Sequence, residues 1–151
     1  LLPCLYAFFG TMAFCFLFNI RGRKVIFAAF GGTVAWLAYL LTGYVVANDI
    51  FQYFVGTVAI SLYAELFARL HKAPAIVYLV VGLIPLVPGS GIYYTMEHCI
   101  TGNTAEFMAV GLHTLSIAGA IALGVLVVSS LIRLVMTAQL HYYLRKKREN
   151  A

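Results

Sequence analysis

The sequence predicts an all-α integral membrane protein with about five transmembrane helices, the fourth of them broken at a proline–glycine stretch. Hydrophobic residues make up 63% of the 151 residues and charged residues only 10%, whereas a soluble domain is roughly half apolar and a quarter charged. Apolar runs long enough to cross the roughly 30 Å hydrocarbon core recur along the chain. Short basic clusters stand between these runs. We therefore expect one transmembrane domain over residues 1–144 and a basic cytoplasmic tail over 145–151.

The first two spans are expected at residues 1–20 and 25–46. The 22 residues of the second span would extend about 33 Å at about 1.5 Å per residue, enough to cross the bilayer. Small or weakly polar residues spaced four apart let helices approach closely in lipid. Both spans carry such faces: Ala7, Thr11, Cys15 and Asn19 in the first, and Ala28/Gly32 and Gly31/Ala35 in the second.

The third span, at about 50–70, carries the one sustained polar row in the sequence. Every fourth residue is polar along this row: Tyr53, Thr57, Ser61, Glu65 and Arg69. At 100° per residue the row drifts by about 40° per step, so it spirals slowly along one side of the helix.

The fourth span, at about 75–99, contains the break. Residues 75–84 form a short apolar helix, the proline–glycine stretch interrupts it, and the helix resumes from about Ile92 to Cys99. The last span, at about 107–136, is longer than the bilayer requires, so it must tilt or project.

The basic clusters alternate along the chain and predict the topology. RGRK, RLHK and RKKR follow the first, third and fifth spans, and the loops after the second and fourth spans contain no Lys or Arg. Loops rich in Lys and Arg stay cytoplasmic. The pattern therefore favours five spans with the N-terminus outside and the C-terminus cytoplasmic. It also favours a full crossing by the broken segment, because a re-entrant loop would put the basic tail outside.

Two prolines and the residues after them make the break a candidate site. Pro85 and Pro88 lack N–H groups and disrupt the helix, and a break against lipid would leave backbone groups unpaired. Behind Pro88, the N–H groups of Gly89, Ser90 and Gly91 would be free at the positive end of a new helix, which suits a carboxylate or phosphate. The alternative is a packing kink or a gating hinge without a ligand.

The second candidate is the Glu65–Arg69 pair. Glu four residues before Arg is the favoured order for an ion pair on a helix, so one interpretation is a structural pair near the cytoplasmic end. The other is functional, because ionisable residues inside a membrane are functional candidates. In that case Glu65 carries a proton or binds a cationic group, and Arg69 orients it or meets an anionic substrate.

Other chemistry has little support in the sequence. His98, Cys99 and His113 lack a third convincing metal ligand, so we expect no metal and no cofactor. No catalytic triad or dyad and no phosphate-binding loop is present, which argues against an enzyme. The net charge of +5 does not indicate nucleic-acid binding, because the basic residues sit in short clusters between apolar runs.

Two segments resemble the threonine/serine exporter family. They are GTVAISLYAELFARLHKAPAIVYLVVGLIPLVPGSGIYYTM and FGTMAFCFLFNIRGRK, and the most telling parts are 69–74 and 84–89. The chain resembles the small, C-terminal-type subunit of the split, two-component form of that family. The resemblance implies a larger partner subunit, a bacterial inner-membrane location, and export of threonine, serine or a dicarboxylate such as succinate, driven by the proton gradient. It transfers no known set of functional residues.

Together these features predict a mechanism. The substrate carboxylate sits at the helix end behind Pro88, Tyr93 and Tyr94 line or gate the cavity, and Glu65 with Arg69 couples protons or charge. Five short spans are few for a complete carrier, so we expect a hetero- or homo-oligomer. Two other classes stay open: a non-transporting scaffold or assembly subunit, and a homo-oligomeric channel.

Overall fold

A computed structural model describes residues 2–149, which form helices joined by short loops, without strands in that range. The all-α prediction is thus confirmed. The elements are α1 Leu2–Leu17, α2 Lys24–Gly43, α3 Asp49–Leu70, α4 Ile76–Leu83, the 3₁₀ turn η1 Ile84–Leu86, α5 Gly89–Ile100 and α6 Thr104–Glu149. Residues 1, 150 and 151 lie outside the described part, as do the side chains of 140 and 142–149, so the contacts of the predicted basic tail do too.

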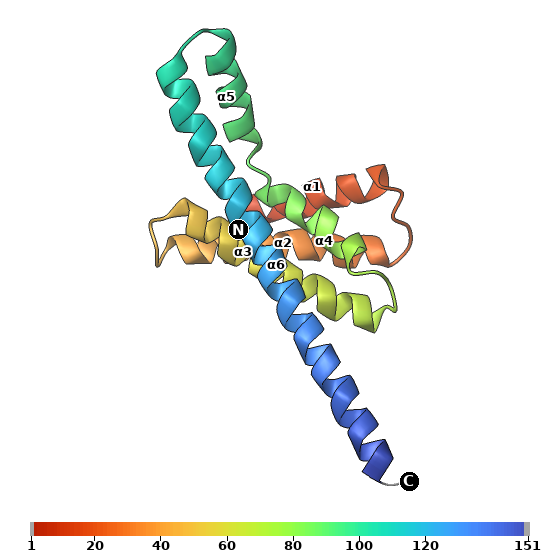
Figure 1. The fold of residues 1–151 in the computed structure, drawn as a ribbon. Coiled ribbons are helices and arrows are strands. Elements are labelled where there is room, and N and C mark those ends of the chain that lie inside the picture. Colours follow the sequence, from red (N-terminus) through yellow and green to blue (C-terminus); the bar gives the residue numbers. More distant parts are fainter. Residues whose placement is uncertain (1, 150–151) are drawn as a thin grey trace.

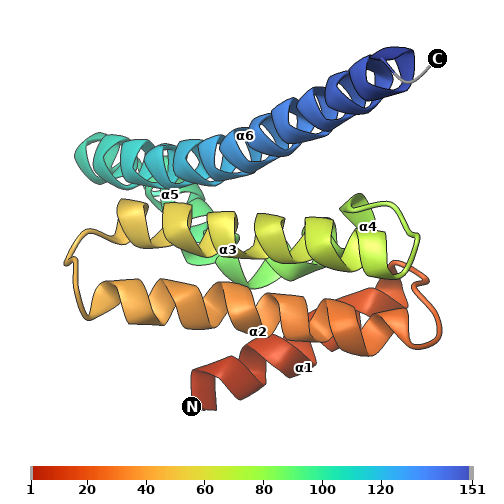
Figure 2. The ribbon, with the colours of Figure 1, turned by 90° about the horizontal axis from the view of Figure 1, so that it is seen from below.

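The helices form two connected parts (Figure 1). Helix α2 packs against α1, α3 and α4, and α6 lies across α3 on the side away from α2. Seen from below, α1, α2, α3 and α6 follow one another as layers (Figure 2). Helix α5 forms a hairpin with α6 and, within residues 2–149, packs against no other helix. Much of α5 and α6 is therefore left uncovered by the rest of this chain.

Length and composition identify the helices that can cross a membrane. Helices α2, α3 and α6 qualify individually, and the α4–η1 segment with α5 qualifies as a bent fourth. Helix α1 is apolar but has 16 residues, about 24 Å at about 1.5 Å per residue, which is less than the roughly 30 Å core. A multi-helix membrane protein is confirmed, and the number of five spans stays a prediction.

Several helix boundaries differ from those the sequence predicts. Helix α2 ends at Gly43 rather than Val46, and α6 begins at Thr104 rather than Phe107. Helix α1 ends at Leu17 rather than Ile20, because Asn19 adopts a left-handed conformation (φ 56°) and the Ile20 N–H closes the end by donating to the Cys15 carbonyl. Helix α5 begins at Gly89 rather than Ile92. Helix α6 has 46 residues and ends at Glu149 rather than near 136, because no glycine or proline follows Gly124.

The predicted small faces do bring helices together. In α1 and α2 every member of these faces is buried except Asn19. Gly32 lies against Thr11 of α1, and Gly31 of α2 and Gly82 of α4 both lie against Ile60 of α3, which is fully buried. A larger residue at these glycines would push the helices apart, because contacts this close leave no room for a side chain.

Candidate functional site

The break between α4 and α5 follows from its two prolines. Pro85 lies in the first turn of η1, where no N–H is needed. Pro88 disfavours the helical conformation of the residue before it, and Val87 is accordingly extended (φ −63°, ψ 125°). The two helical segments differ in direction by 55°. The predicted break is therefore confirmed, and it is a change of direction rather than a mild kink.

The first turn of α5 presents some of the predicted backbone donors. The Gly89 N–H donates to the Val87 carbonyl (2.7 Å), and the Ile92 N–H donates to the Pro88 carbonyl (3.1 Å). Among residues 2–149, no acceptor is found for the N–H groups of Ser90 and Gly91. Of the three predicted donors, the N–H groups of Ser90 and Gly91 are thus unpaired, whereas the Gly89 N–H is used within the turn.

The two tyrosines of α5 face away from the other helices of the chain. Tyr93 and Tyr94 are 65% and 51% exposed, and their rings contact each other edge to face at 5.4 Å between centroids. No residue of α5 is buried. Gly91 faces the other way and lies directly against Thr114 of α6. Any cavity that these tyrosines line must therefore be completed by another molecule.

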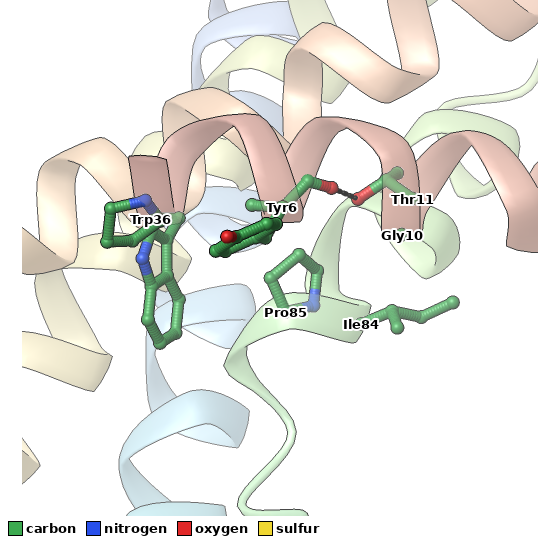
Figure 3. Close-up of a pocket in the computed structure, with 8 residues that line it drawn as sticks. Tyr6, Gly10, Thr11, Trp36, Ile84 and Pro85 are labelled. Carbon is green, nitrogen blue, oxygen red and sulfur yellow. Dashed lines mark hydrogen bonds between the residues drawn. The ribbon is translucent and has the colours of Figure 1, made fainter. Parts of the chain in front are cut away.

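A cavity of about 280 Å³ lies on the α4 side of the break, between α1, α2 and η1. Figure 3 shows Tyr6 of α1 and Trp36 of α2 near Pro85. The volume is close to the lower end of the roughly 300–1,000 Å³ range of small-molecule pockets. The lining is largely apolar and comes from Pro3, Tyr6, Ala7, Gly10, Thr11, Trp36, Ile84 and Pro85.

Sequence reasoning assigned Pro85 to the break but missed its partners across this cavity. The Trp36 ring stacks on Tyr39 at 5.0 Å between centroids. Its indole Nε1 is buried without a hydrogen-bond partner among residues 2–149. Tyr6 lies in the first predicted span but is not part of its small face. No local signal places Tyr6 and Trp36 beside Pro85, because at least 49 positions separate them from it.

The Glu65–Arg69 pair exists but is loose and remote from the break. Arg69 Nη2 lies 3.8 Å from Glu65 Oε2, and the two side chains are 56% and 29% exposed. A partly exposed pair of this spacing contributes about 0.3–0.5 kcal/mol. Leu86 of η1 packs against Gly56, which precedes Glu65 by nine positions, or about 13.5 Å along the helix. The two predicted functional groups therefore do not meet.

A second side-chain pair joins two helices and was missed in the sequence. Asp49 Oδ2 lies 2.7 Å from His113 Nε2, although the residues are 64 positions apart. The other carboxylate oxygen, Asp49 Oδ1, accepts the Ile50 N–H at 2.8 Å. Asp49 had been assigned to a loop and His113 weighed only as a metal ligand. The available signal was that Asp49 lies four residues before Tyr53, where the polar row begins.

No group of three His, Cys, Asp or Glu side chains in the part of the chain that the structure describes is arranged to hold a metal ion. His98 and Cys99 lie on α5, and His113 is bonded to Asp49 on α3. The fold and the break thus define an integral membrane protein with a discontinuous helix. Such helices occur in secondary transporters, which place binding sites at the interruption.

Comparison with protein families identifies the family directly. The family model described as "Threonine/Serine exporter, ThrE" matches residues 3–131. This match covers most of the chain, so the chain belongs to the threonine/serine exporter family. Neither the curated proteins nor the solved structures gave a match. The resemblance carried by the two sequence segments is confirmed at the level of the family, and membership makes the chain a multi-pass membrane protein of a transport family.

Proposed function

We propose that the chain is the small subunit of a two-component secondary exporter in the bacterial inner membrane, with its C-terminus in the cytoplasm. With a larger subunit it would export threonine and serine, or a dicarboxylate such as succinate, in exchange for protons. The observation that supports this most is the 55° break in a helix pair of membrane-spanning length, in a chain of an exporter family. Irregular backbone at membrane depth is tolerated only inside protein or beside a wet cavity.

The proposed substrate contact is the first turn of α5. Threonine, serine and succinate all carry a carboxylate, and the unpaired N–H groups of Ser90 and Gly91 point out of a helix end that carries about half a positive charge. Gly89 leaves this turn open, because nothing would lie within 4 Å of a Cβ there. Pro85 and Pro88 hold the break, and the cavity behind Pro85 gives the segment room to move.

The proposal also gives roles to the exposed residues. Tyr93 and Tyr94 would line or gate the substrate path together with the larger subunit, since this chain leaves both exposed. Glu65 with Arg69 would couple protons or charge at the end of α3 predicted to be cytoplasmic. Because they lie about 13.5 Å or more along α3 from the packing of η1, their coupling to the substrate site would run through helix movement rather than contact.

Efflux from proteoliposomes tests this proposal. The chain and its larger subunit are reconstituted together, loaded with radiolabelled serine, threonine or succinate, and exposed to an imposed pH gradient. Ser90→Leu should block the carboxylate contact and Glu65→Gln the coupling, so both should reduce gradient-driven export. Matched controls are Ser116→Leu on an exposed face of α6 and Glu106→Gln in its first turn.

The outcomes separate the functional classes. Unchanged export by Ser90→Leu and Glu65→Gln, at normal membrane insertion, would refute the site assignment. Absence of flux with the larger subunit present would favour the scaffold interpretation. Ion conductance by this chain alone that does not depend on the pH gradient would favour the homo-oligomeric channel.

A further inference from the structure

The polar row of α3 begins one step earlier than the sequence analysis placed it. Asp49, the first residue of α3, lies four positions before Tyr53. The row therefore runs from Asp49 at one end of the helix to Glu65 near the other, 16 positions apart, or about 24 Å. One charged group stands at each end, and the groups between them are hydroxyls.

The middle of this row is buried between helices. Thr57 is 0% and Ser61 is 3% exposed, and Thr57 lies against Gly124 of α6. The Thr57 hydroxyl donates to the Tyr53 carbonyl at 2.8 Å, which leaves its oxygen free to accept. This middle part therefore consists of two buried hydroxyls, of which that of Thr57 lies against α6.

Ser61 differs from the other buried hydroxyls on these helices. Its Oγ is buried and has no hydrogen-bond partner among residues 2–149, whereas Thr57 and Thr114 both donate to the carbonyl four residues back. An unpaired buried hydroxyl is unfavourable, and Ala64, one turn further on, shows that a methyl group suffices for packing on this helix. The Ser61 hydroxyl is therefore a position in the row where an entering water molecule would find an unpaired partner.

The spacing of the row suits water as that partner. Neighbouring members are separated by about 6 Å along the helix, and two successive O–H···O bonds of about 2.8 Å span nearly that distance through one water. In the structure, Gly124 of α6 packs directly against Thr57 and interrupts the row at that position. A small outward movement of α6 would admit water there, so the row would conduct only in some positions of α6.

The Asp49–His113 pair supplies the proton-binding group at the first end. It joins α3 to α6 through a 2.7 Å contact, at the end of α3 that the charge alternation predicts to face outward. The neighbouring residue Thr114 lies against Gly91 in the first turn of α5. A change of charge at His113 or Asp49 would thus act on the helix that also touches the break.

We propose that α3 carries a proton-relay row that takes up protons at the Asp49–His113 pair and delivers them through the hydroxyls of Tyr53, Thr57 and Ser61 to Glu65. This inference rests on the proposed proton-driven export, for which it supplies the route. A proton from outside binds the Asp49 carboxylate or the His113 imidazole. Each water and hydroxyl then accepts one proton and releases another, so it ends unchanged. The Glu65 carboxylate accepts the proton and releases it on the inner side, with no change of oxidation state.

The other ionisable groups on the packed elements do not compete for these positions. Within the described part of the chain, no hydrogen bond or ion pair joins any of them to Asp49, His113 or Glu65, apart from Arg69. On the elements packed around the row, the described groups of this kind include Tyr39 of α2 near its outer half. Near its inner half they include Lys24 of α2, Tyr63 of α3, Tyr78 of α4 and Arg133 of α6, and the α5–α6 hairpin adds Glu97, His98 and Glu106.

Conservative removal of the buried hydroxyls tests the relay. Ser61→Ala and Thr57→Val preserve most of the packing volume, and their matched controls are Ser116→Ala and Thr42→Val, whose hydroxyls lie outside the row and donate to the carbonyl four residues back. The full chain is reconstituted with its larger subunit, and a pH-sensitive dye inside the vesicles follows proton movement during serine efflux. Serine–serine exchange without a gradient is measured in parallel.

The relay predicts a selective loss. Ser61→Ala and Thr57→Val should lower gradient-driven serine efflux, and the proton movement that accompanies it, by about tenfold or more. This is a modest share of the roughly 10²–10⁴-fold that a positioned proton-transfer group contributes. Serine–serine exchange in these variants, and both activities in the two control variants, should stay near wild type. Retained gradient-driven efflux in both row variants would overturn the relay, and so would a parallel loss of exchange, which indicates a structural role. Wild-type efflux that does not depend on the pH gradient would overturn the relay but would not contradict the proposed export function. Absence of any wild-type transport would instead refute the proposed function.

Discussion

Two glycines in the first turn of α5 give a direct test of how the broken helix is held. Gly91 faces α6, and a Cβ there would overlap Thr114 Oγ1 and lie 3.2 and 3.3 Å from Thr114 Cγ2 and Cβ. Nothing lies within 4 Å of a Cβ at Gly89. Gly91→Ala should therefore loosen the α5–α6 contact, and Gly89→Ala should not.

The magnitudes follow from opposing effects. Alanine at Gly89 should stabilise the helix by about 0.4–1 kcal/mol, because it restricts the unfolded chain without a clash. Alanine at Gly91 gains a similar amount but overpacks the contact, which typically destabilises by about 1–3 kcal/mol. If the Thr114 side chain rotated away instead, it would lose its hydrogen bond to the Val110 carbonyl, which costs about 0.5–1.5 kcal/mol. The two variants should differ by about 2 kcal/mol, or roughly 30-fold in the equilibrium for opening α5.

Amide hydrogen exchange of α5 in detergent micelles measures this opening. Exchange in Gly91→Ala should be roughly 30-fold faster than in Gly89→Ala. Adding Thr114→Ala to Gly91→Ala removes the two shorter contacts and should recover most of the difference. Equal protection in Gly89→Ala and Gly91→Ala would show that α5 does not pack on α6 through this face.

Two further predictions concern contacts between other helices. A double-mutant cycle with Asp49→Asn and His113→Gln should give a coupling of up to about 1 kcal/mol in the free energy of unfolding, as expected for a short but partly exposed pair; additive effects would argue against the contact. Gly32→Ala should destabilise the protein by about 1–3 kcal/mol because its Cβ would clash with Thr11, whereas Gly10→Ala, with open space around it, should be neutral or stabilising in the same thermal unfolding measurement.

Several features of the fold are local and could be predicted from the sequence. Apolar run length identified α2, α3 and α6 as helices long enough to cross a membrane, because the bilayer sets a minimum length for each span. Pro85 and Pro88 predicted the break, because a missing N–H acts on the helix that contains it. Gly31 and Gly32 predicted close helix contact, although the sequence did not say which helices would meet them.

The helix ends were less predictable than the helices. The left-handed turn at Asn19 ended α1 early, because a polar side chain tolerates that conformation where longer apolar residues do not. Helix α6 ran on through the basic tail to Glu149, since nothing in that segment disfavours a helix. Both outcomes depend on small conformational preferences that apolar patterning does not report.

By itself, then, the sequence determined that this is a helical membrane protein with one broken helix, one polar helix row and the family it belongs to. Only the tertiary structure decided that Pro85 lines a cavity with Tyr6 and Trp36, that Asp49 meets His113, and that Glu65 is remote from the break. These relations join residues far apart in the chain, and they arise from how close-packed helices cross. Periodicity along one helix gives the face on which a residue lies, whereas the partner of that face is set by packing between helices.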